Sequence, residues 1–132
     1  MEPYQNGSGA GQPDVVNNSW GGSGGQNWYQ SYVQNWRSAG IFPAFSNGNA
    51  GPACGTAGSP GDYPESFASG ATTSADAIAS SSSRGPSAFG GIIKPNISAP
   101  GSSVRSSVPA NHYASYSGTS MASPHTAAPA GR

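Results

Sequence analysis

The sequence has few charges and no long apolar run. Charged residues make up 8% of the 132 residues, and 5 Lys and Arg against 5 Asp and Glu give a formal net charge of +0. There is no basic patch to attract nucleic acid and no basic amphipathic helix for a membrane surface. No apolar run approaches the roughly 20 residues that span a bilayer, and no charged-then-apolar leader begins the chain. We therefore expect partners that are neither nucleic acid nor membrane.

Cysteine and histidine are also scarce. The one cysteine, Cys54, indicates a lost disulfide partner, an intermolecular bridge or a buried thiol. We do not interpret it as a nucleophile, because no base motif accompanies it. The two histidines are His112 and His125. We expect neither a metal ion nor a cofactor. Hydrophobic residues reach only 34%, against 20 Gly and 12 Pro, so the core of this one-domain chain is expected to be thin.

The stretch 118–125 (GTSMASPH) carries the strongest chemical signal. A Gly-Thr turn precedes Ser120 and helix formers follow it, which predicts that Ser120 lies where a helix begins. Unpaired backbone N–H groups and the positive end of the helix dipole favour negative charge at such a place. A hydroxyl there is suited to attack a carbonyl and leave an oxyanion beside it. The alternative is a Ser that merely caps the helix.

Four other stretches have a recognisable pattern. Residues 46–52 (SNGNAGP) follow the apolar run 41–45 and are also an ordinary turn sequence. Residues 14–22 (DVVNNSWGG) read as a strand and the loop after it, and a bare strand edge with Gly beside it can bind an extended peptide. The stretches 82–86 (SSRGP) and 94–101 (KPNISAPG) complete the set.

Together these motifs resemble the subtilisin-like serine peptidases, the subtilases, and within them the bacillopeptidase-F-like and related secreted members. The resemblance runs from about Asp14 to His125. It implies that Ser120 is the nucleophile of an acyl transfer. It also implies that the Asn49 side-chain amide donates to the developing oxyanion, a role that needs a neutral donor fixed before the charge forms.

The same resemblance assigns substrate contacts. Ser19, Trp20 and Gly21 would lie alongside the substrate backbone and form one wall of the main specificity pocket, and Gly48 is counted with them. It further implies a cis peptide bond at Ser59-Pro60.

The base and the acid of a Ser-His-Asp enzyme are not apparent in the sequence. The family signatures, an Asp-x-Gly turn and a His-Gly-Thr-His helix start, do not occur. His125 lies five residues after Ser120, ~140° round a helix, and is interpreted as a hydrogen-bonded core or structural residue; His112 is interpreted as a surface loop residue. The chain therefore resembles the carboxyl-terminal half of a subtilase catalytic domain.

Strand–helix–strand order predicts an α/β fold: three layers, a mostly parallel sheet and a partial subtilisin-like domain over 14–132, after a flexible segment 1–13. An aromatic stripe at helical spacing, Trp28, Tyr32 and Trp36, is expected to pack in the core. Pro129 is expected to end the last helix early. The expected strands cover 15–18, 41–45, 67–73, a short edge at 77–82, and 92–97; the expected helices cover 26–38 and 120–128.

Three functions remain open for this sequence. The first is a secreted serine hydrolase that cleaves peptide bonds, with its base supplied by another chain, an upstream segment or a surrogate group. The second is an esterase that acts on short-chain esters through the same Ser120. The third is a non-catalytic fragment that binds peptides or associates with itself. In each case we expect self-association or a missing subtilase half as partner, because exposed strand edges and apolar faces drive pairing.

Overall fold

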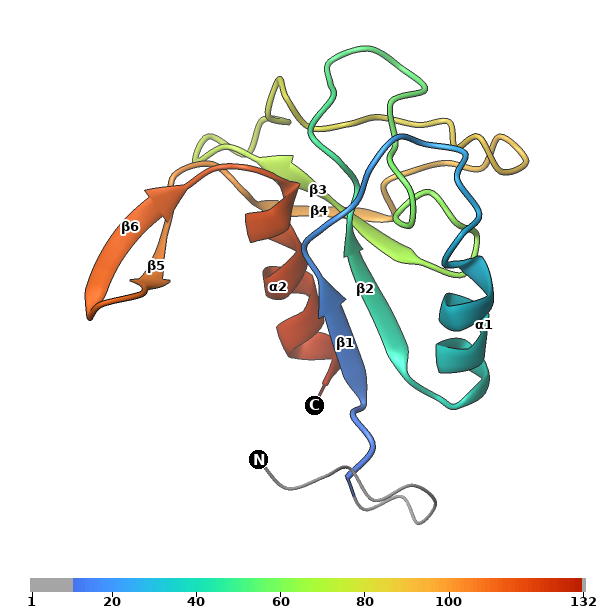
Figure 1. Ribbon diagram of the computed structural model, residues 1–132. Helices are drawn as coiled ribbons and strands as arrows, with labels where there is room; N and C mark the ends of the chain where they lie inside the picture. Colours follow the sequence, from blue (N-terminus) through green and yellow to red (C-terminus); the bar gives the residue numbers. More distant parts are fainter. Residues whose placement is uncertain (1–10, 132) are drawn as a thin grey trace.

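The computed structural model describes residues 11–131, so residues 1–10 of the expected flexible segment lie outside the described part of the chain. Four parallel strands form the central sheet in the order β1-β2-β3-β4 (Figure 1). A separate antiparallel hairpin, β5–β6, follows them. The elements are β1 (Val15–Asn18), α1 (Gln30–Ser38), β2 (Phe42–Ser46), β3 (Phe67–Thr72), β4 (Ile97–Pro100), β5 (Val104–Val108), β6 (His112–Tyr116) and α2 (Thr119–Ala130).

The two helices cover opposite faces of the sheet (Figure 1). Phe45 of β2 packs with Val33 of α1, whereas Ala71 of β3 packs with Ala122 of α2. Phe45 pairs in register with Ala68, three residues before Ala71, and side chains alternate along a strand, so Phe45 and Ala71 point to opposite faces. The predicted three-layer α/β fold with a mostly parallel sheet is confirmed.

Helix α2 is held on the sheet by small side chains and hydrogen bonds. Ser123 Oγ donates to Asn17 Oδ1 at 2.7 Å, and the hydroxyls of Ser69 and Thr126 are 2.8 Å apart. The expectation that Pro129 ends this helix early was wrong, because α2 continues to Ala130. The packing of α2 against all four strands holds the helix together despite the missing N–H of each proline.

The aromatic stripe of α1 is only partly in the core. Trp36 stacks on Phe45 at 6.4 Å between ring centroids, as expected. Trp28 and Tyr32 are 73% and 61% exposed, which contradicts the expectation for these two side chains. The helix begins at Gln30, not near residue 26, because the backbone before it is bound by Tyr63: its hydroxyl donates to the Gln26 carbonyl at 2.6 Å and accepts from Tyr29 N–H at 3.3 Å.

Three further differences concern strands and turns. The sequence did not predict the β5–β6 hairpin, whose side chains are mostly exposed, so that no inside–outside alternation marks it. The expected edge 77–82 is reduced to one bridge between Thr72 and Ile78, and the strand expected over 92–97 begins only at Ile97. The cis peptide bond predicted at Ser59-Pro60 is confirmed; three more X-Pro bonds are cis, at residues 52, 86 and 95.

Cys54 is a free, exposed thiol, so it is neither buried nor paired within the described residues. None of the helices between residues 11 and 131 is long and apolar enough to cross a membrane.

Lys94 is the one charged side chain among residues 11–131 whose pKa falls far below its ordinary value. The residue is 3% exposed, and its Nζ donates to the carbonyl oxygen of Ser66 at 2.6 Å and to Asn96 Oδ1 at 3.0 Å. Burial lowers the pKa of Lys94 from 10.5 to about 8, against the raising effect of Asp62 and Glu65. The folded chain therefore releases this proton at a lower pH than the unfolded chain does.

We expect the free energy of unfolding to rise between pH 8 and pH 10, because the unfolded chain binds the Lys94 proton more tightly than the folded chain. The rise is on the order of 1–3 kcal/mol. Above pH 10 the raised pKa of Tyr63, caused chiefly by burial, acts in the opposite direction. Urea unfolding across this range measures the slope. Lys94→Met is expected to flatten it and Arg105→Met, at an exposed position, to leave it unchanged; an unaltered slope in Lys94→Met contradicts the prediction.

Candidate active site

The predicted site residues meet in one small pocket at the carboxyl ends of β1 and β2. This Ser120 pocket has a volume of about 260 Å³. It is lined by Trp20, Gly21, Gly22, Ser46, Gly48, Asn49, Gly58 and Ser120. Ser19, the remaining predicted residue, is hydrogen-bonded to Ser120. Gly22, Ser46 and Gly58 were not predicted as site residues, although Gly22 and Ser46 belong to the motifs that were.

Parallel strands bring these distant segments together. β1 leads into Ser19 and β2 leads into Asn49, and both strands point the same way, so their loops meet at one edge of the sheet. Ser120 arrives from the opposite end of the sequence, as the second residue of α2. Gly118 precedes it with φ 151°, where a side chain is strained, and an added Cβ would lie 3.3 Å from Asn49 Oδ1.

Ser120 and Ser19 are joined by two reciprocal hydrogen bonds. Ser120 Oγ donates to the Ser19 carbonyl at 3.1 Å, and Ser19 Oγ donates to the Ser120 carbonyl at 2.8 Å. Pro124 has no N–H to donate to the Ser120 carbonyl four residues before it, so the Ser19 hydroxyl supplies this carbonyl with a hydrogen bond. In this arrangement the Ser120 hydroxyl donates to a carbonyl oxygen, which is too weak a base to take up its proton. The hydroxyl is thus positioned without being activated.

Asn49 has its amide oriented by Thr119. Its Oδ1 accepts hydrogen bonds from Thr119 N–H at 2.8 Å and from Thr119 Oγ1 at 3.1 Å. Thr119 is fully buried and its Oγ1 also accepts from Gly48 N–H at 3.2 Å. With the amide oxygen occupied by two donors, the Nδ2 donor remains for a ligand, and no acceptor among residues 11–131 binds it. The sequence had not singled out Thr119 for this role, although it lies within the Ser120 motif.

The electrostatics of the Ser120 pocket come from dipoles. None of its eight lining side chains is charged. The backbone N–H of Ser120 has no acceptor in the described chain, as expected for the first turn of a helix, and the α2 dipole places partial positive charge there. Asn49 Nδ2 and Ser120 N–H therefore provide two neutral donors next to the Ser120 hydroxyl. This arrangement favours an oxygen atom that gains negative charge.

Neither histidine contacts Ser120 through a hydrogen bond. His125 Nδ1 lies 2.8 Å from the Met121 carbonyl oxygen, which confirms a hydrogen-bonded residue, but the side chain is exposed and not part of the core. His112 is exposed at the start of β6, not in the preceding loop. His125 and Ser120 both line a separate α2 pocket of about 460 Å³ between α2 and β5. Within residues 11–131, no hydrogen-bonded Ser, His and Asp occur together.

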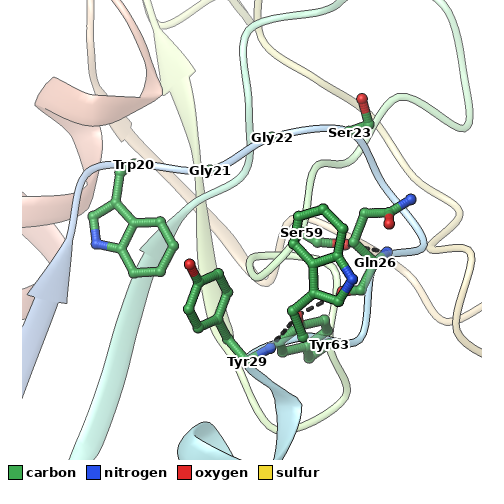
Figure 2. A pocket seen from close by; sticks show the side chains of 9 residues that line it. Trp20, Gly21, Gly22, Ser23, Gln26, Tyr29, Ser59 and Tyr63 are labelled. Carbon is green, nitrogen blue, oxygen red and sulfur yellow. Dashed lines mark hydrogen bonds between the residues drawn. The ribbon is translucent and has the colours of Figure 1, made fainter.

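A larger, aromatic pocket adjoins the Ser120 pocket across the segment Trp20–Gly22. It has a volume of about 570 Å³, and Figure 2 shows Tyr29 and Tyr63 below that segment. The rings of Trp20 and Tyr29 meet edge to face at 5.2 Å between centroids. Residues 20–22 therefore form a wall with a pocket on either side.

Comparisons with known proteins agree with this fold. The subtilase family model matches residues 4–132. Bacillopeptidase F of Bacillus subtilis (strain 168) is 52% identical over 124 residues, which is 88% of this chain and 8% of that protein. A subtilisin of Bacillus pumilus is 40% identical over 116 residues, 86% of this chain and 40% of that protein. Among solved structures, the S41 psychrophilic protease superimposes with a TM-score of 0.75 at 36% identity, covering 89% of this chain and 41% of that one.

The fold and pocket place the protein among the α/β proteins that carry a serine at a helix start above a parallel sheet. The chain belongs to the subtilase family, the subtilisin-like serine peptidases. It spans less than half the length of each of the relatives named above.

Proposed function

We propose that this chain is the nucleophile-bearing part of a serine hydrolase that cleaves peptide bonds through Ser120. The observation that carries the proposal is the fixed orientation of the Asn49 amide. Two hydrogen bonds from Thr119 to Oδ1 leave Nδ2 without an acceptor in the described chain, beside Ser120. A donor fixed in this way needs no reorganisation when an oxyanion forms. A merely capping Ser needs no such neighbour.

The chemistry assigned to these groups is an acyl transfer. Ser120 Oγ forms a bond to the substrate carbonyl carbon, its proton passes to a base, and the carbonyl oxygen gains negative charge. Asn49 Nδ2 and Ser120 N–H donate to that oxygen. The tetrahedral intermediate expels the leaving amine, which takes up the proton, and water then hydrolyses the Ser120 ester.

In this proposal the base belongs to residues outside the described part of the chain. Ser120 Oγ donates to the Ser19 carbonyl, so it must turn toward an incoming base before it can react. The α2 pocket, which Ser120 and Met121 help to line, is the place where such a segment would reach the hydroxyl. Among residues 11–131, β1 is an edge strand of the sheet, and the side of β1 that no described strand pairs offers backbone groups to the same segment or to a second copy.

An extended peptide is the substrate class that fits the wall of residues 19–22. Its backbone would lie along this wall, with one side chain in the Ser120 pocket. Ser19, Trp20, Gly21 and Gly48 are the substrate-binding residues of the proposal. The proposal also includes secretion, and the glycine-rich, charge-poor composition supports this part of it.

Hydrolysis of short-chain esters is the second candidate. The observation that favours it is the absence of a base hydrogen-bonded to Ser120 within residues 11–131. An activated ester has a leaving group that needs little protonation, so a positioned hydroxyl and two oxyanion donors are enough for slow turnover.

We expect the isolated chain to hydrolyse p-nitrophenyl acetate slowly and a tetrapeptide p-nitroanilide not at all, because the amide needs a protonated leaving group. Addition of an upstream subtilase segment that bears the family Asp and His motifs is expected to restore amide cleavage. Sedimentation equilibrium on the same samples measures whether the isolated chain self-associates. Full amidase activity from a folded monomer would contradict the proposal, and the absence of turnover on both substrates, with peptide still bound, would support the non-catalytic alternative.

A further inference from the structure

The wall between the two pockets continues into a segment with little order of its own. The glycine loop, residues 21–25, reads Gly-Gly-Ser-Gly-Gly. Glycine loses more conformational freedom on folding than any other residue, so this loop requires contacts from elsewhere to keep one geometry. Its first two residues, Gly21 and Gly22, line both the Ser120 pocket and the aromatic pocket. Whatever holds the loop therefore also shapes the proposed peptide-binding wall.

The contacts come from one short segment, residues 59–62. The carbonyl of Ser59 accepts from Gly22 N–H at 2.9 Å, and its Oγ accepts from Gln26 N–H at 2.9 Å (Figure 2). Asp62 Oδ2 accepts from Gly25 N–H at 2.8 Å. These bonds hold Gly22 and Gly25 of the loop and Gln26, the residue that follows it. Asp62 supplies the one charged acceptor among them.

Asp62 is buried against the loop. Its side chain is 0% exposed, and its own carbonyl accepts from Ser87 Oγ at 2.6 Å. A Cβ added at Gly24 would lie 3.3 Å from Asp62 Oδ2, so the loop backbone packs directly on the carboxylate. A hydrogen bond to a charged acceptor is about twice as strong as a neutral one. Burying a carboxylate is costly, and the interaction with the Gly25 N–H offsets part of that cost.

We propose that Asp62 is a positioning residue that sets the affinity for extended peptides by fixing the glycine loop through Gly25. This role rests on the proposed peptide-binding function of residues 19–22. Asp62 has no hydrogen bond to Ser120 or Asn49, so it acts on the wall and not on the chemistry. Loss of its carboxylate leaves Gly25 N–H without an acceptor and lets Gly21 and Gly22 leave the geometry that a peptide backbone requires.

The test compares Asp62→Ala, which removes the acceptor, with Asp62→Asn, whose amide oxygen can still accept from Gly25 N–H. Asp76→Asn, at an exposed position, is the matched control. Calorimetry measures the dissociation constant of an uncharged tetrapeptide amide on the full chain, and p-nitrophenyl acetate turnover is followed in parallel. We expect Asp62→Ala to weaken peptide binding on the order of tenfold. Asp62→Asn and the control should bind within about threefold of the parent chain, and all four proteins should turn over the small ester equally.

Each result decides between this role and a merely structural one. Unchanged peptide affinity in Asp62→Ala, equal losses in the Ala and Asn variants, or a parallel loss of ester turnover overturns the proposal. If the parent chain binds peptide without ester turnover, the hydrolase proposal fails and the affinities still decide this one; if it binds no peptide, this proposal fails as well. Should Asp62→Ala not fold, amide exchange of the parent chain provides the answer: Gly25 N–H must be protected before peptide is added, and rapid exchange there overturns the role.

Discussion

Replacing Ser120 with Ala is expected to remove all turnover of p-nitrophenyl acetate and all labelling by a fluorophosphonate. Ser120 Oγ is the atom that would form the acyl bond, and it lies beside both proposed oxyanion donors at the start of α2. Turnover should fall to the rate in buffer, the largest effect we predict for a single substitution. Thermal unfolding should change little, because the hydroxyl makes one hydrogen bond to a carbonyl in a partly exposed position.

Two neighbouring serines provide the controls for that substitution. Ser117 Oγ accepts from Ser103 N–H at 2.8 Å in the turn before α2, and Ser123 Oγ is bonded to Asn17 on the buried side of the helix. Both Ser117→Ala and Ser123→Ala should keep labelling and ester turnover, although Ser123→Ala loses a buried hydrogen bond and some stability. Labelling that survives Ser120→Ala would place the nucleophile elsewhere.

Asn49→Ala is expected to lower kcat for the ester far more than it changes KM. The oxyanion exists in the transition state and not in the bound ester, so its donor contributes to the chemical step. The expected loss is roughly 100- to 1000-fold, a magnitude that was measured on subtilisin, a relative of this chain, and is carried over from it. Steady-state kinetics on the parent chain and the variant separate the two constants.

The neighbouring Asn47 distinguishes a donor from a structural amide. Asn47 is fully buried, and its Nδ2 donates to the Ser83 carbonyl at 2.7 Å, so its side chain faces the core and not the pocket. Asn47→Ala should lower stability while the folded fraction keeps its kcat. Equal losses of kcat in both variants, after correction for folded protein, would show that Asn49 acts through the loop and not on the oxyanion.

The parts of the site that lie in short motifs were predictable from sequence. The segment 118–125 placed Ser120 at a helix start, and the β1 and β2 patterns placed Ser19 and Asn49 just beyond the ends of parallel strands. Each of these depends on local backbone preferences and on the rule that parallel strands end at one edge. The first three strands of the central sheet and both helices were predictable for the same reason, to within a few residues, whereas β4 begins only at Ile97, the last residue of the strand expected there.

What the motifs left open depends on contacts between distant residues. Thr119 orients Asn49 across 70 positions of sequence, and Asp62 reaches Gly25 across 37. A buried Thr or Asp has no sequence pattern of its own, because its partner is a backbone group that any residue can offer. Trp28 and Tyr32 have helical spacing, yet Trp28 lies outside α1 and both remain exposed because the sheet meets that helix only at Val33 and Trp36.

The sequence by itself therefore determined the family, most of the parallel sheet, both helices, and the positions of Ser120 and Asn49, the proposed nucleophile and oxyanion donor. These features reside in contiguous residues with local conformational preferences. The tertiary structure alone decided how the Asn49 amide is oriented, which acceptor the Ser120 hydroxyl donates to, and which residues hold the glycine loop. These are matters of hydrogen-bond direction between segments far apart in the chain. Only the packing of α2 and residues 59–63 against the sheet brings those segments within reach of each other.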